Sequence, residues 1–451
     1  MKNKKVLVYG TGISGIAASA LLLRHEAQVF LYDENENKVA AEIAETVKGL
    51  DEEHIVLGSL EEKFISSLDL VVLSPGIPLD NPNVLRLKEA GLPIWGEIEL
   101  GYYFEKGRVL AITGTNGKTT TTALLGKIME AAYNHSFVVG NIGIPYTSIA
   151  DQTMEDSVTV AEISSFQLET AIDFKPQVSA ILNITPDHLN RHHTMDCYVD
   201  AKMAIAKNQG PSEYMILNYE DEILRKRAQE VKAKVIYFSS KRRLEEGIYL
   251  ANDQIFLKIG DDYEMIAKVK ELQLIGNHNY ENVMAAAAMA YCAGAGVETI
   301  SKVVKEFVAV EHRIEYVDTV NGVRYYNDSK GTNPDAAIQA IKAMQWPTCL
   351  IGGGYDKQSE FDEWIASFDG KVKKLVLIGQ TAQKIADTAE KMGFKDYEFA
   401  DSLEEAVRIC AENAKSGDAV LLSPACASWG MFDNYEQRGD MFKEFVREMK
   451  G

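Results

Sequence analysis

Residues 108–132 read RVLAITGTNGKTTTTALLGKIMEAA, an apolar run followed by a Gly/Thr loop and a helix-length segment. Glycines at 114 and 117 allow backbone N–H groups to turn toward an anion. Lys118 can reach the β- and γ-phosphate oxygens of a nucleotide, and the Thr119 hydroxyl suits a phosphate-bound Mg²⁺. The spacing departs from the common phosphate loop, because Ile112 stands where that loop begins with glycine. The stretch still predicts an ATP-binding α/β domain, with a plain turn and helix cap as the alternative.

Short aliphatic runs alternate with helix-length segments along the whole chain. Examples are VLVYG at 6–10, LVVLS at 70–74, VSAIL at 178–182 and AVLLS at 419–423. Such runs are typical of parallel strands buried on both faces, so we expect an α/β protein with mainly parallel sheets. Residues 245–268 alternate in polarity instead, which predicts a small antiparallel group appended to the second domain.

The chain of 451 residues is too long for a single hydrophobic core. Three α/β patterns begin near the N-terminus, at the strand before the Gly/Thr loop, and after a His-Arg pair. We therefore expect three domains at 1–98, 99–311 and 312–451. The first and third are expected to be Rossmann-like, and the central one is expected to be a phosphate-loop ATPase domain with a parallel sheet.

Composition narrows the classes of partner. Lys and Arg total 47 and Asp and Glu total 66, giving a net charge of −19. Such an acidic chain does not favour binding to nucleic acid or to an anionic membrane. No run approaches ~20 apolar residues, so no transmembrane helix is expected. Five widely spaced cysteines without a C-x-x-C pattern indicate reduced thiols in a cytoplasm, with no disulfide framework or zinc site built on them.

A second glycine loop, Gly10-Thr-Gly-Ile-Ser-Gly15, follows the first strand and precedes a helix, and Asp33 ends the next strand. The G-x-G-x-x-G pattern taken alone predicts a dinucleotide site. A different nucleotide diphosphate is the first alternative ligand, since the loop recognises pyrophosphate. The second alternative is a purely structural glycine turn that binds no ligand. Residues 74–78 (SPGIP) end a further strand and could close the same site.

Metal-capable residues follow two strands of the central domain. Glu162 ends one strand and is placed like an oxygen ligand for Mg²⁺, although a solvated glutamate is the alternative. Residues 183–193 (NITPDHLNRHH) follow another strand, which indicates a site on a loop. On sequence alone His188 is more often an ordinary polar loop residue than a ligand. For Lys202, which lies in a helix-like segment, the expectation is a surface lysine.

Three strand ends of the third domain carry small, basic and hydroxyl residues. They are residues 326–334 (YNDSKGTNP), 351–357 (IGGGYDK) and 421–428 (LLSPACAS). We expect these ends to converge on one crevice suited to a small anionic substrate, with Lys330 and Lys357 as its charge partners.

Seven motifs, in order and over nearly the whole chain, resemble those of the Mur ligases. They are GTNGKTT at 114–120, E-x-S-S-F-Q-L-E at 162–169, TPDHLNRH at 185–192, G-x-H-N-x-x-N at 276–282, HR at 312–313, NDSKGTNP at 327–334 and LSPACAS at 422–428. Within that family the N-terminal glycine loop, Asn116 and the run at 423–442 resemble the ligase that adds D-glutamate. A D-N-P-R motif of the diaminopimelate- or lysine-adding members is absent from the sequence.

The resemblance implies an ATP-dependent amide-forming enzyme. It would add D-glutamate to UDP-N-acetylmuramoyl-L-alanine through an acyl phosphate, in cytoplasmic peptidoglycan precursor synthesis. The partners would be these small molecules, with neither nucleic acid nor membrane, and the chain is expected to be a monomer. We also expect the third domain to close on the others during the reaction.

The resemblance also implies roles for individual residues. The UDP-sugar would contact Gly12, Ile13, Ser14, Gly15, Asp33, Ser74, Pro75, Gly76 and Asn141. ATP would contact Gly114, Thr115, Asn116, Gly117, Lys118, Thr119, Thr120, Asn279, Asn282, Arg313, Asp328 and Lys330. D-glutamate would contact Thr332, Lys357, Ser428 and Tyr435. The catalytic residues would be Lys118, His188 and Lys202. Two Mg²⁺ ions would be held by Thr119, Glu162, His188 and Lys202, the last as a carbamate formed with CO₂.

Three other functions remain open on the sequence. An NAD-dependent dehydrogenase explains the first glycine loop but not GTNGKTT. A related ligase, such as the L-alanine-adding Mur ligase or a folylpolyglutamate synthetase, would share the central domain. A non-enzymatic nucleotide-binding regulator would bind the same nucleotides without turnover.

Overall fold

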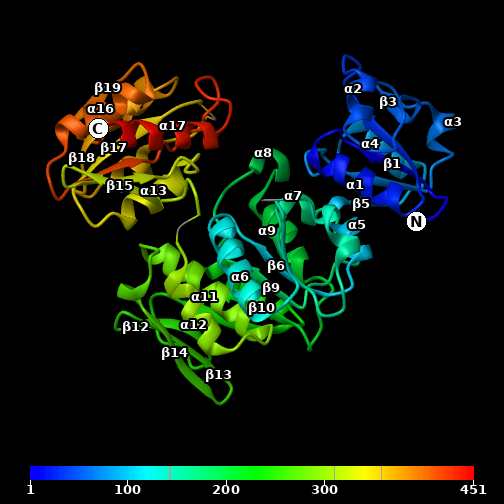
Figure 1. The fold of residues 1–451 in the computed structure, drawn as a ribbon, viewed down its shortest axis with the longest axis horizontal. Helices are drawn as coiled ribbons and strands as arrows, with labels where there is room; N and C mark the ends of the chain where they lie inside the picture. The colour runs from blue at the N-terminus through cyan, green and yellow to red at the C-terminus, as the bar shows by residue number, and fades with distance from the viewer. Residues whose placement is uncertain (142–143, 309, 357, 451) are drawn as a thin grey trace. The chain divides into compact units, whose positions relative to one another are not determined.

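The computed structural model describes residues 1–141, 144–308, 310–356 and 358–450. The chain forms two compact units, one of Met1–Val269 with Glu281–Lys305 and the other of Lys270–Tyr280 with Glu306–Gly451. The first unit holds two β-sheets and the second holds one, each covered by helices (Figure 1). The predicted α/β class with three sheet domains is therefore confirmed.

The first sheet is entirely parallel, in the order β3-β2-β1-β4-β5. Its strands are β1 (Lys5–Tyr9), β2 (Gln28–Asp33), β3 (Ile55–Leu57), β4 (Leu70–Leu73) and β5 (Ile94–Gly96). Its helices are α1 (Ile13–Arg24), α2 (Ala40–Glu45), η1 (Glu52–His54), α3 (Glu62–Ile65), α4 (Pro82–Glu89) and α5 (Glu97–Phe104). The strand order reverses between β1 and β4, and ligands of open parallel sheets bind at such a reversal.

The second sheet has the order β14-β13-β12-β11-β10-β9-β6-β8-β7. Its strands are β6 (Arg108–Thr113), β7 (Ser136–Gly140), β8 (Val158–Glu162), β9 (Val178–Ile181), β10 (Tyr214–Asn218), β11 (Lys234–Ser239), β12 (Gly247–Ala251), β13 (Gln254–Ile259) and β14 (Asp262–Lys268). The helical segments are α6 (Lys118–Ala132), η2 (Tyr146–Ser148), η3 (Ala150–Gln152), α7 (Ser165–Leu168), α8 (Leu189–His192), α9 (Met195–Met203), η4 (Ala204–Ala206), α10 (Glu222–Arg227), η5 (Ala228–Glu230), η6 (Val269–Glu271), α11 (Asn277–Cys292) and α12 (Val297–Glu306). The antiparallel pairing of β12, β13 and β14 confirms the prediction for residues 245–268.

The third sheet has the order β15-β16-β20-β17-β18-β19 and is parallel except for the β15–β16 hairpin. Its strands are β15 (Glu315–Val320), β16 (Val323–Asn327), β17 (Thr348–Gly353), β18 (Val372–Ile378), β19 (Tyr397–Phe399) and β20 (Ala419–Leu422). Its helices are α13 (Pro334–Ala343), α14 (Asp362–Ala366), α15 (Ala382–Lys391), α16 (Leu403–Asn413) and α17 (Tyr435–Glu448). Because β16, β20 and β17 are neighbours, the three predicted strand ends do meet at one edge.

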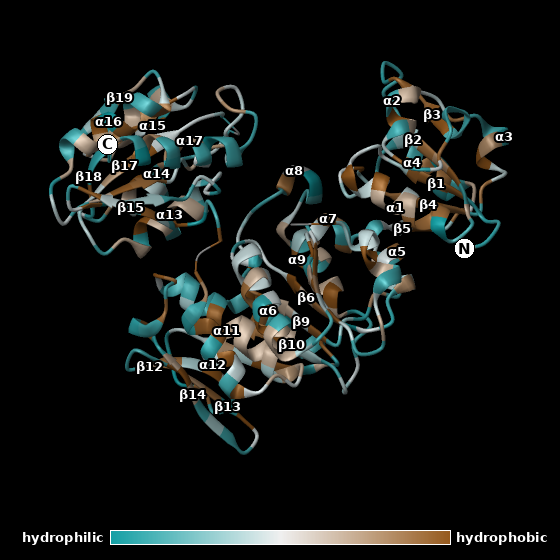
Figure 2. Cartoon of the chain, viewed as in Figure 1, coloured by the Kyte–Doolittle hydropathy of each residue, from teal (hydrophilic) through white to brown (hydrophobic). Residues whose placement is uncertain are grey.

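The hydrophobic core lies between each sheet and the helices that cover it. The central strands, which supply much of this core, are mainly brown in Figure 2. Val6, Leu7 and Val8 of β1 are fully buried, as a strand covered on both faces must be. Within the described residues, no helix combines the length and the apolar character needed to cross a bilayer.

Buried glutamates of α5 tie the two sheets of the first unit together. One Glu97 oxygen accepts the backbone N–H and the hydroxyl of Thr147, each at 2.7 Å. Glu99, which is 3% exposed, accepts backbone N–H groups from three consecutive residues, 172–174. Charged acceptors make stronger hydrogen bonds than neutral ones, so these carboxylates fix the course of the loops that they contact.

Candidate active site

The Gly/Thr loop links the buried strand β6 to helix α6. Gly114 and Gly117 have φ values of 149° and 86°, and both need glycine. A Cβ at Gly117 would lie 2.3 Å from the Asn282 Oδ1 atom. Asn183 fixes the loop from the adjacent strand end, since its side chain accepts from the Asn116 N–H at 2.8 Å and donates to the Asn116 carbonyl at 3.0 Å.

Two lysines donate to one carbonyl of this loop. Lys118 Nζ and Lys202 Nζ each lie 2.8 Å from the Gly114 oxygen. Lys202 is only 2% exposed, and its ammonium lies 4.6 Å from the centre of the Tyr198 ring. Burial, together with the charge of Lys118, holds the pKa of Lys202 well below its ordinary value. The prediction of a surface lysine at position 202 is therefore wrong.

Glu162 lies at the end of β8 and is 1% exposed. Its Oε1 accepts from the Asn141 amide at 2.9 Å, whereas Oε2 is buried with no hydrogen-bond partner in the described part of the chain. A buried carboxylate oxygen without a partner is costly unless a cation or a donor satisfies it. The alternative of a solvated glutamate is thus wrong, and the donor set fits Mg²⁺, which prefers oxygen ligands.

The loop after β9 carries three histidines in different environments. His188 has a left-handed φ of 53°, its side chain is half exposed, and Nε2 lies 3.5 Å from Asp187. His192 is buried, with Nε2 at 2.9 Å from the Ser165 hydroxyl, and burial lowers the pKa of its imidazole. His192 and Asn183 both lie in the predicted loop segment, but sequence alone did not distinguish them from their neighbours.

The N-terminal glycine loop occupies the reversal point of the first sheet. A Cβ at Gly15 would lie 1.8 Å from the Gly10 carbonyl oxygen, whereas a Cβ at Gly12 or Gly76 meets no atom within 4 Å. The Ser74 hydroxyl donates to the Gly10 carbonyl at 3.4 Å. The predicted residues from the ends of β1 and β4 are therefore brought together around an open glycine surface.

Asp33 borders this loop at the end of β2. Its Oδ2 accepts from the Thr11 hydroxyl and from Lys38 Nζ, each at 2.7 Å. Burial alone would raise the pKa of Asp33, but these hydrogen bonds and one from the Asn35 N–H lower it. Asp33 is thus an anion held in place by its neighbours.

A polar cluster beside Asp33 was missed by the sequence analysis. The Glu34 carboxylate accepts from the hydroxyl of Tyr9, and from the amides of Asn81 at 2.8 Å and Asn83 at 2.9 Å. Burial and the hydrogen bond to Glu34 raise the pKa of Tyr9 far above its ordinary value. These residues are scattered in sequence and match no spacing pattern, so only the sheet topology could reveal them.

The predicted crevice of the third sheet contains a fully buried aspartate. Asp328 is 2% exposed, and its oxygens accept from the Ser423 hydroxyl at 2.7 Å and the Ile314 N–H at 3.2 Å. Burial raises the pKa of Asp328 to about 7, although the positive charge of Arg313 acts to lower it. This carboxyl therefore titrates near neutral pH.

Arg438, which the sequence analysis did not select, joins two of the strand-end loops. It is fully buried and donates to the Ser329 hydroxyl at 2.9 Å, the Ser329 carbonyl at 2.8 Å and the Cys426 carbonyl at 3.2 Å. The Lys330 ammonium lies 5.2 Å from the centre of the Tyr435 ring. A buried arginine with fixed donors of this kind orders the loops around it.

The remaining predicted residues divide between the two units. Asn282 accepts from the Thr121 hydroxyl at 3.3 Å in the first unit, whereas Asn279 belongs to the second unit and donates to the Ile275 carbonyl at 2.8 Å. Ser428 is 4% exposed, and Thr332 is partly buried. Lys357 lies outside the described residues.

Three family models match consecutive parts of the chain. They are described as Mur ligase MurD-like, N-terminal domain (residues 4–96), Mur ligase middle domain (112–290) and Mur ligase, glutamate ligase domain (312–426). The chain belongs to the Mur ligase family. The glycine loop of the first sheet therefore belongs to a Mur ligase N-terminal domain. This loop was the feature that favoured an NAD-dependent dehydrogenase, so that alternative has no remaining support.

Curated relatives of this Mur ligase match it from end to end. The UDP-N-acetylmuramoylalanine–D-glutamate ligase of Lachnospira eligens is 58% identical over 450 residues, covering 100% of both chains. A protein of the same name from Thermoanaerobacter sp. is 49% identical over 452 residues, covering 100% of this chain and 99% of its own.

Solved structures of other Mur ligases share the fold. UDP-N-acetylmuramate-alanine ligase MurC from Thermotoga maritima gives a TM-score of 0.61 at 19% identity, covering 99% of each chain. MurF ligase from Thermotoga maritima in complex with ADP gives a TM-score of 0.60 at 18% identity, and the match covers 99% of this chain and 96% of that chain.

Proposed function

We propose that this Mur ligase adds D-glutamate to UDP-N-acetylmuramoyl-L-alanine, using ATP, in the cytoplasmic synthesis of peptidoglycan precursors. The observation that carries the proposal is the loop of residues 114–118, where two lysines share one carbonyl at the start of α6. Such a loop suits the phosphates of ATP. The end-to-end similarity to relatives named as D-glutamate ligases supports the choice of substrates.

The chemical problem is that a carboxylate resists attack by an amine. Transfer of the ATP γ-phosphoryl group to the carboxylate of the L-alanyl residue releases ADP and gives an acyl phosphate, which has a good leaving group. The amine of D-glutamate then attacks, and the tetrahedral intermediate collapses to an amide and phosphate. Lys118 and the N–H groups at the start of α6 would neutralise charge on the transferred group, and catalysis would come mainly from positioning.

We assign the three domains, at 1–98, 99–311 and 312–451, to the UDP-sugar, ATP and D-glutamate respectively. The proposed UDP-sugar residues are Gly12, Ile13, Ser14, Gly15, Asp33, Ser74, Pro75, Gly76 and Asn141. The proposed ATP residues are Gly114–Thr120, Asn279, Asn282, Arg313, Asp328 and Lys330. The proposed D-glutamate residues are Thr332, Lys357, Ser428 and Tyr435. The open glycine surface of the first sheet and the buried donors of the third support these assignments.

We further propose that Thr119, Glu162, His188 and a carbamate on Lys202 hold two Mg²⁺ ions. When bound, Mg²⁺ supplies positive charge to the phosphoryl oxygens during the transfer. The partnerless Glu162 oxygen supports the first site. A carbamate forms only on a neutral amine, and the lowered pKa of Lys202 favours that form.

The test is a panel of amino acids, each incubated with the purified chain, ATP, Mg²⁺ and UDP-N-acetylmuramoyl-L-alanine while phosphate release is measured. We expect release with D-glutamate well above that with L-glutamate, L-alanine or glycine. Faster release with another amino acid would reassign the substrate. Absence of any substrate-dependent turnover would favour a nucleotide-binding regulator.

A further inference from the structure

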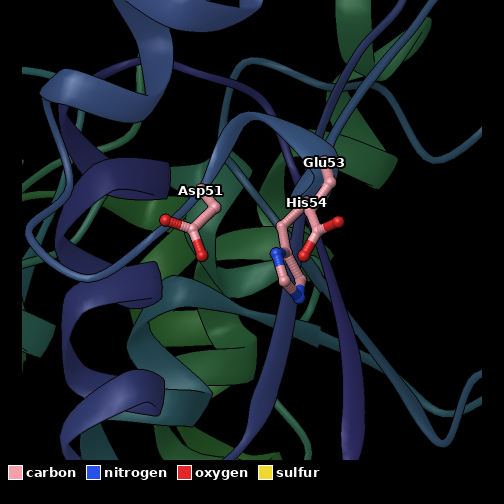
Figure 3. A group of neighbouring side chains, drawn as sticks. All are labelled: Asp51, Glu53 and His54. Carbon is pink, nitrogen blue, oxygen red and sulfur yellow. The ribbon is translucent and has the colours of Figure 1, made fainter.

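A group of three metal-capable side chains lies in the first domain, away from the proposed substrate sites. Asp51 precedes the short helix η1, Glu53 lies within it, and His54 ends it just before β3. One ligand atom from each residue lies within 4.8 Å of the other two. Figure 3 shows the His54 ring flanked by the two carboxylates.

The imidazole of His54 carries a second, independent observation. Its Nδ1 atom is shielded from solvent and has no hydrogen-bond partner in the described part of the chain. The ring packs against Phe30, with centroids 5.2 Å apart, so the side chain is held in its orientation. A shielded ring nitrogen without a partner costs free energy, and a bound cation would remove that cost.

The spacing of the three atoms fits a small cation. An ion at the centre of a triangle with 4.8 Å sides lies about 2.8 Å from each corner, because the side is divided by the square root of three. Zinc binds imidazole nitrogen and carboxylate oxygen at about 2.0–2.2 Å. The ligand atoms therefore need to move toward the ion by no more than about 0.6–0.8 Å. The exposed carboxylates of Asp51 and Glu53 can supply most of this movement by side-chain rotation.

The donor chemistry selects the kind of ion. One imidazole and two carboxylates suit a borderline divalent metal such as Zn²⁺ better than Mg²⁺, which favours all-oxygen sites. Two carboxylates and a neutral imidazole also balance the charge of one divalent ion. We propose that Asp51, Glu53 and His54 form a binding site for Zn²⁺ or a similar divalent transition metal, with water completing the coordination.

The position of this site indicates a structural role. His54 lies at the amino end of β3, whereas the nucleotide loop lies at the carboxyl ends of β1 and β4. Neither α2 nor η1 has a buried residue, and the edge strand β3 is only partly buried. Val47 and Leu50 are the buried apolar contacts of residues 40–57. A metal here would fix a weakly packed connection at the sheet edge.

The experiment measures Zn²⁺ binding to the full chain by calorimetry in the presence of saturating Mg²⁺, which competes for the proposed catalytic sites. The variants are Asp51→Asn, Glu53→Gln and His54→Gln, which keep side-chain size. The control is Asp156→Asn, which removes a carboxylate of a different exposed pair, 3.1 Å from His135. We expect the wild type and the control to bind one more Zn²⁺ than each variant, or to bind it at least roughly tenfold more tightly.

A second measurement distinguishes the loss of a metal site from a general loss of stability in the variants. Zn²⁺ should raise the thermal midpoint of the wild type and control but not of the three variants, because only binding to the folded state stabilises it. All proteins should have the same midpoint shift with ATP and Mg²⁺. Equal Zn²⁺ stoichiometry and affinity in the wild type and all three variants would overturn the proposal.

Discussion

Lys202 lies in an environment that is unusual for a lysine, because its side chain is buried and a second ammonium lies nearby. A buried ammonium beside a second ammonium is unfavourable, which lowers its pKa and increases the neutral fraction at neutral pH. We therefore expect Lys202→Ala to lose nearly all ligase activity and short carboxylates such as formate or acetate to restore part of it. Steady-state phosphate release checks both effects. Failure of every carboxylate to restore activity would contradict a carbamate at this position.

Lys118 contacts the same carbonyl oxygen as Lys202 but is the first residue of helix α6, where we propose that the phosphates of ATP bind. Lys118→Ala removes a positive charge from the proposed phosphate site without emptying the core. We expect a loss of turnover of roughly a hundredfold or more, with the far-ultraviolet circular dichroism unchanged. Near-normal ADP release by a correctly folded variant would refute the assigned role.

Asp328 makes the stability of the chain depend on pH. Its folded pKa of about 7 lies above the ordinary value of 3.8, so the folded state keeps a proton that the unfolded state loses in that window. The free energy of unfolding should therefore fall as pH rises through the window and level off above it. Asp328→Asn should remove this contribution, making the variant more stable than the wild type by up to a few kcal/mol above pH ~7.

Urea unfolding at several pH values checks this prediction. The stability difference between Asp328→Asn and the wild type should shrink as the pH falls from about 7 and vanish below 3.8, where both the folded and the unfolded wild type carry the proton. A difference that does not change with pH would show that the amide alters packing rather than removing a buried charge.

At the scale of the element, the loop between β6 and α6 depends on backbone shape as much as on charge. Gly117→Ala would place a methyl group 2.3 Å from the Asn282 amide oxygen, at a φ of 86°. We expect weaker ATP binding and a loss of roughly 1–2 kcal/mol in stability. Gly49→Ala is the matched control, since its φ is 90° but its Cβ meets no atom within 4 Å. Equal ATP affinity in both variants would contradict the role of the loop shape.

Elements with strong local signals could be predicted from the sequence. The apolar run before Gly114 predicts a strand that is buried on both faces. The glycines at 114 and 117 predict a turn after it, and the residues from Lys118 onward predict a helix. Strand β6, the loop and helix α6 therefore follow from local sequence rules. Arg438 and Glu34 could not be predicted in this way. Their roles depend on which strands are neighbours, and an arginine in a helix or a glutamate after a strand is ordinarily exposed.

At the scale of the molecule, the net charge of −19 gives little information about the ligands. The proposed substrates are anions, and in the proposed sites their binding would depend on local groups such as Lys118 and Lys330 rather than on the total charge. Length is more informative, since each sheet has its own helices and the chain exceeds what one core supports.

The two compact units should also unfold separately. Four buried clusters of the described residues each lie within one unit, so each unit has the means to unfold as a cooperative body. Glu99→Gln weakens three hydrogen bonds in the first unit, and Arg438→Met leaves two carbonyls of the second without their donor. Each change should cost roughly 1–3 kcal/mol.

Scanning calorimetry of the full chain without ligands measures whether these losses stay separate. We expect two transitions, with Glu99→Gln lowering the midpoint of one and Arg438→Met lowering that of the other, because substitutions without shared partners act independently. The double variant should show both shifts, each unchanged in size. If both substitutions instead lower the midpoint of one common transition, the units unfold together, and the energetic coupling between them exceeds what their separate cores imply.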